Sequence, residues 1–307
     1  MLPLAALIVV TAVWGVTFVQ VKDAVEIYPL FAFLAVRFAI ATLTLAVPAA
    51  PRVRSLGRSG IGAGALLGLL LAGGYALQTA GLQRTTVSST GFITGMYVVL
   101  TPLIAVGLLR SRIGAATWVG VALSTAGLAL LSGIDAGSPG GDLLVLAGAA
   151  VYSLQIVLME RYAPRFDAVA FTLVEMLAAC LGLGAVAVAA GDLTVPRGWT
   201  VWSALLVTGV FASALAFLVQ TWAQRRTSAT RTALAFAMEP VFTAFFGYTL
   251  AGDRIGALGW GGAALIMAGI VLSEPAAARA LSAAVSRRGS RAQCRSKQWP
   301  DPRDPPA

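Results

Sequence analysis

The chain has 307 residues, of which 58% are hydrophobic and only 11% are charged, and its mean hydropathy is +0.83. Soluble domains carry about a quarter charged residues, so this composition excludes a soluble globular protein. Histidine is absent, which excludes imidazole catalysis and histidine-ligated metals. Cys180 lies in an apolar run and Cys294 in a basic segment, a pairing that fits neither a disulfide nor a metal site.

Apolar stretches of roughly 20 residues recur along the whole chain, and each is long enough to cross a bilayer as a helix. Their continuous Leu-, Ala-, Gly- and Val-rich composition favours helices over the alternating strands of a membrane barrel. In chain order we expect ten spans, at 2–21, 30–48, 61–83, 86–109, 114–132, 143–160, 168–190, 199–223, 229–251 and 255–273. The first lacks a basic start and is too long for a signal peptide, so we interpret it as an uncleaved span. The sequence predicts an all-α integral membrane protein with ten transmembrane helices.

The basic residues behind the net charge of +9 gather in every second loop and in the C-terminal segment. This clustering is a topology signal of membrane proteins, so nucleic acid is not an expected partner. The alternate loops hold only Lys22, Arg84, Arg197 and Arg254. The positive-inside rule then predicts a multi-pass protein of the inner (plasma) membrane with both termini in the cytoplasm. The preference for Arg over Lys is typical of a GC-rich bacterial genome, and residues 275–307 are expected to form a disordered basic tail.

The chain contains an internal repeat. QTAGLQRTTVSSTGFITGM, which begins at Gln78, aligns with QTWAQRRTSATRTALAFAM, which begins at Gln220, and RIGAATWVG at Arg112 aligns with RIGALGWGG at Arg254. Five spans thus recur as a second five, and a repeat of five spans enters the membrane from opposite sides in its two copies. The sequence therefore predicts two inverted five-helix repeats. The predicted divisions are a first repeat, a linker, a second repeat and the tail, at 1–133, 134–142, 143–274 and 275–307.

The membrane region resembles the EamA-type members of the drug/metabolite transporter superfamily. The resemblance rests on AVWGVTFVQVKDAV in the first span, on AVRFAIATLTL in the second, and above all on AFAMEPVFTAFFGYTLAGDRIGALGWGGAALIMAGIVLSE at the end of the second repeat. It implies ten spans, an inverted repeat and the movement of small organic solutes, often outward. The resemblance does not indicate which solute is moved, and the basic tail is not part of the family's core.

Two prolines are expected to interrupt spans at corresponding places in the two repeats. Pro240 cannot donate a hydrogen bond to the carbonyl four residues back, and Pro102 removes the same bond in the fourth span. Breaks at equivalent positions of two repeats point to a transporter's binding site. The alternative is a packing kink, which membrane helices tolerate.

Glu239 directly precedes Pro240 and is the only charge in TALAFAMEPVFTAFFGYTLAG. An intramembrane charge costs roughly 3 kcal/mol or more unless it is paired or neutralised. Three interpretations are open. Glu239 binds an amine or cationic group of the substrate, it carries a coupling proton, or it has a structural or gating role at the break.

Arg37 and Glu175 are the other charges inside apolar spans, and a repeat offset of 138 places them at similar depth in the second and seventh spans. One hypothesis is a buried ion pair between them. The alternative is that Arg37 bonds backbone carbonyls or reaches the membrane interface with its long side chain.

Aromatic and polar residues on the predicted inward faces are candidates for a substrate pocket. Such a mixture suits a mostly apolar site for amphiphilic metabolites. The alternative for aromatic residues is an interfacial belt. The candidates, all within predicted spans, are Trp14, Tyr75, Gln78, Tyr97, Tyr152, Gln155 and Gln220.

These features favour a secondary transporter that moves small organic metabolites or drugs, in the efflux direction, by alternating access. No phosphate-binding loop of the G-x-x-x-x-G-K-[ST] type occurs, and we expect no cofactor and no metal. The alternative is a membrane-embedded enzyme acting on lipid-linked substrates, but such an enzyme needs clustered acids, and here they are scattered. The expected partners are a small-molecule substrate and the lipid bilayer, and a homodimer is compatible with the sequence.

Overall fold

The computed structural model describes residues 2–85, 87–132, 138–246, 248–249 and 256–273, and the regular elements of this part of the chain are all helices. Arg254, the predicted tail at 275–307 and half of the predicted linker at 134–142 lie outside the described residues.

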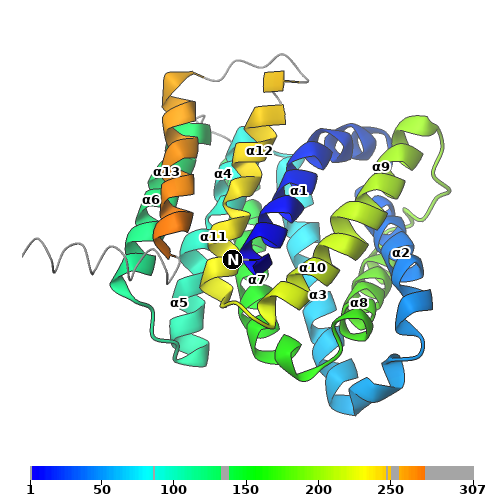
Figure 1. Ribbon diagram of the computed structural model, residues 1–307. Helices are drawn as coiled ribbons and strands as arrows, with labels where there is room; N and C mark the ends of the chain where they lie inside the picture. Colours follow the sequence, from blue (N-terminus) through cyan, green and yellow to red (C-terminus); the bar gives the residue numbers. More distant parts are fainter. Residues whose placement is uncertain (1, 86, 133–137, 247, 250–255, 274–307) are drawn as a thin grey trace, which may run out of the picture.

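The first half of the chain forms helices whose lengths follow its apolar segments (Figure 1). In chain order they are α1 (Leu2–Ile27), α2 (Leu30–Ala49), the 3₁₀ turn η1 (Val53–Leu56), α3 (Gly57–Leu82), α4 (Val87–Gly95), α5 (Tyr97–Leu109) and α6 (Ala115–Ser132).

The second half has a similar order of helices, but its 3₁₀ turn follows its first helix and its third span contains a π-helical stretch. The elements are α7 (Pro139–Tyr162), the 3₁₀ turn η2 (Ala163–Arg165), α8 (Ala168–Ala189), α9 (Trp199–Gly209), the π-helical η3 (Val210–Leu215), α10 (Ala216–Gln224), α11 (Ala229–Phe236), α12 (Met238–Phe246) and α13 (Ala257–Ser273).

Helices lie in each of the predicted apolar segments, but their lengths differ. Within the described chain, six helical segments are long and apolar enough to cross a membrane. α1 makes a seventh if its parts Leu2–Thr17 and Gln20–Ile27 form one span bent by 43°. α6 and α13 are apolar but shorter. The chain is a multi-pass, all-helical membrane protein, and the number of ten spans stays a prediction.

The two interrupted spans break at Met96, between α4 and α5, and at Ala237, between α11 and α12. Pro240 lies in the first turn of α12, where the missing N–H has no intrahelical partner to lose. The predicted break at Pro102 is wrong, because α5 continues through this residue. Membrane helices accommodate a proline by small local adjustments. The break instead follows Gly95, whose residue type weakens a helix.

α6 and α13 lie side by side at one edge of the molecule (Figure 1). Glycines allow this close approach, since a Cβ on Gly120 would lie 2.5 Å from the carbonyl oxygen of Gly269. The same distance separates a Cβ on Gly127 from the carbonyl oxygen of Gly262. Small residues are how membrane helices pack closely where the surrounding lipid gives no hydrophobic driving force.

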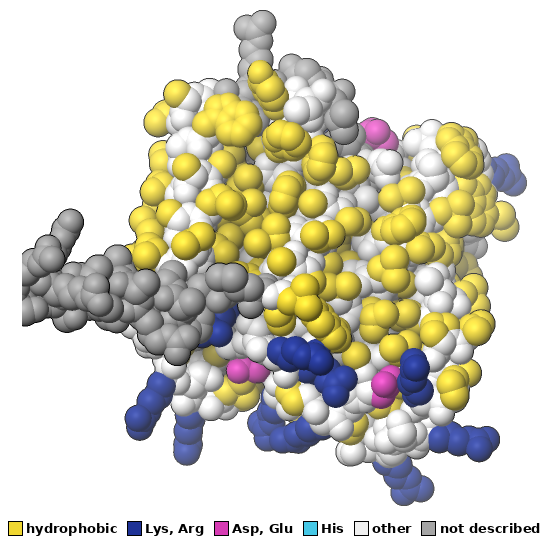
Figure 2. Space-filling view, in the orientation of Figure 1, with side chains coloured by type: hydrophobic (Ala, Val, Ile, Leu, Met, Phe, Trp, Pro, Cys, Tyr) yellow, Lys and Arg dark blue, Asp and Glu magenta, His cyan; other side chains and the backbone are white. Residues whose placement is uncertain are grey.

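The connections α2–α3, α5–α6, α7–α8 and α10–α11 lie at one end of the bundle, which we call the basic face. Its arginines are Arg52, Arg54, Arg58, Arg110, Arg112, Arg161, Arg165, Arg225 and Arg226. Figure 2 shows Lys and Arg side chains along this lower edge, while hydrophobic side chains cover the flank above it. The connections α1–α2, α3–α4 and α8–α9 mark the opposite face.

Candidate functional site

A central cavity lies between α1, α2, α3, α7, α10 and the two interrupted spans. The cavity has a volume of about 90 Å³, counted as the space that the centre of a water molecule can occupy. A single buried water needs roughly 10–15 Å³ on this measure, so the cavity has room for several waters or a small solute. The predicted site residues that line it are Trp14, Arg37, Tyr75, Gln78, Tyr97, Tyr152, Gln155, Gln220 and Glu239.

The cavity does not include every predicted residue. Glu175 is fully buried behind the lining and contacts it through Gln155. Pro102 and Pro240 are not among the lining residues. Pro240 follows the lining residue Glu239 directly, whereas Pro102 lies in the interior of α5.

Arg37 is held by the π-helical stretch η3. Its Nε donates to Ser213 Oγ at 2.7 Å, and its terminal nitrogen donates to the carbonyl of Ala212 at 3.3 Å and to Tyr75 Oη at 3.1 Å. The Trp14 indole N–H donates to the same Ala212 carbonyl at 2.8 Å. A π-turn leaves a backbone carbonyl without its usual helical donor, and such turns are frequent at functional sites. The irregular turn thus positions both a cation and an indole at the cavity.

Arg37 and Glu175, for which an ion pair was one hypothesis, have different partners. Besides its bonds to η3, Arg37 lies over the Tyr75 ring, with its guanidinium carbon 4.7 Å from the ring centroid. Glu175 Oε1 accepts a hydrogen bond from Gln155 Nε2 at 2.7 Å. The structure therefore agrees with the alternative in which Arg37 bonds a backbone carbonyl.

Glu239 enters the cavity from the first turn of α12. Tyr97 lies beside its carboxyl group, and Arg37 is close enough to interact with it electrostatically. The cavity thus combines a guanidinium and a carboxyl side chain in a low-dielectric setting, where electrostatic interactions with a bound solute are strong.

Aromatic rings form most of the apolar lining. Trp14 contacts Phe236 with ring centroids 4.9 Å apart and Phe217 at 5.8 Å. Tyr75 contacts Tyr152 at 5.5 Å in an edge-to-face arrangement. Pairs at these distances stabilise one another by about 0.5–1.5 kcal/mol beyond their area burial, so the lining is pre-formed.

Polar bonds also fix the wall near α4. Gln78 Nε2 donates to Thr94 Oγ1 at 2.9 Å, and Tyr152 Oη donates to Gln78 Oε1 at 3.1 Å. The sequence reasoning missed Thr94, although it lies in the repeat used for alignment. It also missed Phe217, Phe236, Ser213 and Gln224. Gln224 could have been found, since QTWAQ places it one helical turn after Gln220, directly beyond the predicted end of the eighth span at 223.

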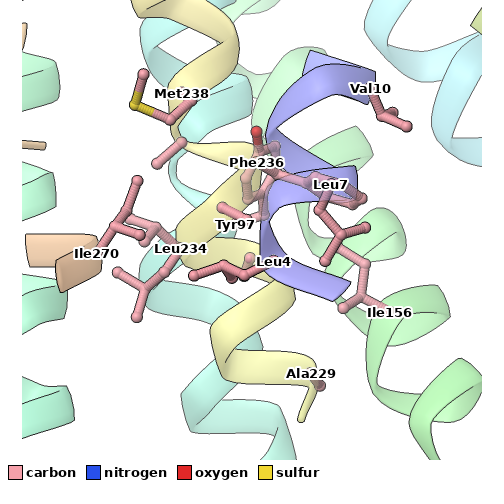
Figure 3. Packing of buried hydrophobic residues seen from close by; sticks show 14 of the residues in the cluster. Leu4, Leu7, Val10, Tyr97, Ile156, Ala229, Leu234, Phe236, Met238 and Ile270 are labelled. Atoms are coloured by element: carbon pink, nitrogen blue, oxygen red, sulfur yellow. The ribbon is translucent and has the colours of Figure 1, made fainter. Parts of the chain in front are cut away.

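A packed apolar region adjoins the cavity and shares the lining residues Tyr97, Ile156 and Phe236 with it, and we call it the basic-side cluster (Figure 3). It is formed by the first turns of α1 together with α5, α6, α7, α10, α11, α12 and α13, and its members include Leu4, Leu7, Val10, Val98, Ala233 and Leu234. Toward the opposite face the cavity reaches Val21, near the end of α1, and Leu82, the last residue of α3.

One carboxylate tethers each interrupted span to α7. Near the basic face, Glu160 Oε2 accepts a hydrogen bond from the backbone N–H of Ala229, the first residue of α11, at 2.6 Å. Near the opposite face, Asp142 Oδ1 accepts hydrogen bonds from Thr85 Oγ1 at 2.6 Å and from Ser89 Oγ at 2.8 Å. α7 therefore holds the beginnings of α11 and α4 at its two ends. Among the described residues, no group of three acids or cysteines is placed to hold a metal.

A bundle of membrane-crossing helices around a partly polar cavity defines the class of multi-pass small-molecule transporters. Residues 1–133 and 139–274 match the EamA-like transporter family, and the chain belongs to this family. The protein is therefore a membrane transporter and not an enzyme, as the resemblance in the sequence implied.

Two relatives and one solved structure illustrate the similarity. An uncharacterized transporter of Archaeoglobus fulgidus is 29% identical over 266 residues, which cover 87% of this chain and 83% of the relative. The uncharacterized inner membrane transporter YedA of Escherichia coli is 28% identical over 284 residues, covering 89% and 90%. A solved crystal structure covers 90% of this chain and 98% of its own with a TM-score of 0.75 at 18% identity, a likeness of fold alone.

Proposed function

We propose that the protein is a secondary transporter that exports small organic metabolites or drugs across the bacterial inner membrane. The observation that carries this proposal is the central cavity, in which Arg37, Glu239 and several aromatic rings meet between two interrupted spans. A mostly apolar site with a few convergent polar groups suits small amphiphilic solutes. The similarity to YedA, an inner membrane transporter, supports the choice of membrane.

We further propose that the two halves are inverted five-helix repeats, at 1–133 and 143–274. The packing supports this division, because helices that are equivalent by the repeat lie against each other, α2 on α8 and α6 on α13. The interruptions also support it. Gln78 and Gln220 are 142 residues apart, and at this offset the interruptions at Met96 and Ala237 are one residue from exact equivalence. Such halves can rock about a central site and expose it to each side in turn.

The proposed state of this conformation is closed to the cytoplasm. We propose that the basic-side cluster lies between the cavity and the basic face, and we assign this face and both termini to the cytoplasm by the positive-inside rule. The cavity extends instead toward the ends of α1 and α3 at the opposite face. Export requires a second state in which the basic-side cluster opens.

For Glu239 we propose a role in substrate contact or gating. Its side chain lines the cavity beside Tyr97 and within electrostatic reach of Arg37, which is where a solute's charged or polar group would lie. A carboxyl group there also remains available to carry a coupling proton, so the two functional interpretations share one site.

The test is comparative metabolite profiling. Wild type, Glu239→Gln and an empty vector are expressed at matched membrane levels, and medium and cytosol are analysed. We expect a small set of metabolites to accumulate in the medium with wild type and to fall at least about tenfold toward the vector level in Glu239→Gln. Glu26→Gln is the matched control, since Glu26 is exposed near the end of α1 and outside the cavity.

An unchanged medium with wild type would contradict export, and depletion of solutes from the medium would indicate uptake instead. Equal export by wild type and Glu239→Gln would remove this carboxyl group from the transport path.

A further inference from the structure

Three glutamine side chains form a buried chain of hydrogen bonds beside the cavity. We call Gln155, Gln220 and Gln224 the glutamine ladder. Gln220 Nε2 donates to Gln155 Oε1 at 3.1 Å and to Gln224 Oε1 at 2.9 Å. Each of the three side chains is 1% exposed. The ladder joins α7 to α10, and both Gln155 and Gln220 line the cavity.

Both ends of the ladder are bound to acceptors. Gln155 Nε2 donates to Glu175 Oε1 at 2.7 Å, and Gln224 Nε2 donates to the carbonyl of Ile156 at 2.8 Å. A backbone carbonyl cannot donate, so Gln224 must turn its nitrogen outward and its oxygen toward Gln220. An ionised Glu175 imposes the same orientation on Gln155, because a carboxylate only accepts. The direction of every amide in the ladder therefore follows from its ends rather than from an arbitrary choice of amide orientation.

One polar atom at the centre of the ladder has no hydrogen-bond partner in the part of the chain that the structure describes. The amide nitrogen of Gln220 carries two hydrogens, and Gln155 and Gln224 accept both. Gln220 Oε1 has almost no accessible surface and has no hydrogen-bond partner among the described residues. A buried acceptor without a donor is costly, and because Gln220 lines the cavity, a ligand can supply the missing donor once a local movement of the lining exposes this oxygen.

We propose that Gln220 Oε1 selects the transported solute by accepting a hydrogen bond from an N–H or O–H group, and that Glu175 is the positioning residue that fixes this acceptor. This inference rests on the proposed function, in which the cavity receives a solute. The solute class is a molecule that joins an apolar, ring-sized body to at least one such donor. The body lies among Trp14, Phe217 and Phe236, and the donor reaches Gln220.

The surroundings of Glu175 explain why an acid is buried in an apolar span. The side chain is 0% exposed, its Oε2 has no partner among the described residues, and Oε1 is bonded by Gln155 alone. Such a group is poorly compensated as a structural element. Its one clear effect is to hold the nitrogen of Gln155 away from Gln220. An apolar residue in its place would release Gln155 to turn and would let Gln220 turn with it.

The test measures binding to the purified full chain in detergent. The probes are 2-phenylethanol and its methyl ether, which share an aromatic body and differ in one O–H donor, and binding is followed by quenching of tryptophan fluorescence. We expect wild type to bind the alcohol roughly five- to tenfold more tightly than the ether, as one hydrogen bond predicts. In Gln220→Met, which keeps the volume and removes the acceptor, the ratio should fall to about one or two.

The role of Glu175 is tested by rescue. Glu175→Leu removes the acceptor and should lower the alcohol-to-ether ratio to about one or two, whereas Glu175→Gln keeps an oxygen acceptor toward Gln155 but can also donate, and should retain part of the ratio. If Glu175 had only a structural role, the preference for the alcohol over the ether would not depend on whether residue 175 carries an acceptor. Ser153→Ala is the control, because Ser153 is buried on α7 near Gln155 but bonds only the carbonyl of Ala149 in the described structure.

Each outcome decides the inference. An unchanged ratio in Gln220→Met, or no binding of the alcohol by wild type, would overturn the acceptor. An unchanged ratio in Glu175→Leu would overturn the positioning role. Transport does not enter this assay. A protein that shows the ratio but exports nothing in cells contradicts the proposed function alone, and one that exports without the ratio contradicts this inference alone.

Discussion

The two ends of the proposed transport path differ in the side chains that form them. Toward the basic face, the basic-side cluster fills the space with leucine, valine, alanine and phenylalanine side chains such as Leu4, Leu7 and Ala233. Toward the opposite face, the path widens into a cavity lined by hydrogen-bonded polar groups and aromatic rings. The basic-side cluster is held by apolar packing, whereas the cavity is held by directed bonds that keep its shape.

The comparison also shows how a repeated sequence produces an asymmetric state. α4 and α11 begin at equivalent positions, and each beginning is tethered to α7 by a carboxylate, Asp142 or Glu160. Near the basic face α11 packs on α1, whereas in the proposed state the path stays open toward the opposite face. The difference therefore lies in which set of contacts is made, and the predictions below separate the two sets.

The largest effect is expected from removing the cation of the binding end. Arg37→Met deletes the bonds to Ser213, Ala212 and Tyr75. Hydrogen bonds to charged groups contribute about 1.5–3 kcal/mol each, so export should fall by well over tenfold at matched protein level. Arg37→Lys should be intermediate, since an ammonium cannot reproduce the planar fork of donors. The measurement is the export rate of the profiled metabolites, and full activity of Arg37→Met would contradict the role of η3 in holding Arg37.

Leu7→Ala should open the closed end. Leu7 is fully buried in the basic-side cluster, and large-to-small changes in packed interiors cost about 2–5 kcal/mol. A cysteine at Ala233, in a chain without Cys180 and Cys294, should then react much faster with an impermeant thiol reagent applied at the basic face. Val9→Ala is the matched control, since Val9 is 64% exposed on the outer side of the same helix. Equal labelling in both variants would refute a packed gate.

The two tethers should act on different ends. Glu160→Ala removes the acceptor at the start of α11, a loss worth about 0.5–2 kcal/mol, and should raise labelling of the Ala233→Cys reporter about two- to thirtyfold. Asp142→Ala removes the corresponding acceptor near α4 and should leave this reporter unchanged. If both variants raised labelling equally, the tethers would not be specific to their ends.

The smallest effect is expected from Trp14→Phe. The change keeps an aromatic ring beside Phe236 but removes the indole bond to the Ala212 carbonyl, worth about 1 kcal/mol. Export should fall only a few-fold, because Arg37 still bonds the same carbonyl. Trp118→Phe, on the exposed side of α6, serves as the control for loss of a tryptophan. A loss as large as that of Arg37→Met would mean that Trp14 itself contacts the solute.

The sequence carried the location of the helices and the identity of the buried charges, but not their partners. A charge such as Glu239 or Arg37 is conspicuous in an apolar run because membranes penalise it. The bonds of Arg37 depend on a π-turn more than 170 residues away, and no residue pattern in VFASAL signals one. The break near Pro102 was misplaced because proline alone does not interrupt a membrane helix.

The tethers on α7 restrict how the protein can move. Asp142 and Glu160 are about 27 Å apart along the helix at 1.5 Å per residue, close to the thickness of roughly 30 Å of a bilayer's hydrocarbon core. This spacing matches one carboxylate at each edge of the hydrocarbon. A piston-like slide of α7 by one turn would draw one of them inward, where an unpaired charge costs roughly 3 kcal/mol or more at the centre. In the proposed exchange between two states, α7 therefore keeps its depth while the other helices tilt or rotate around it.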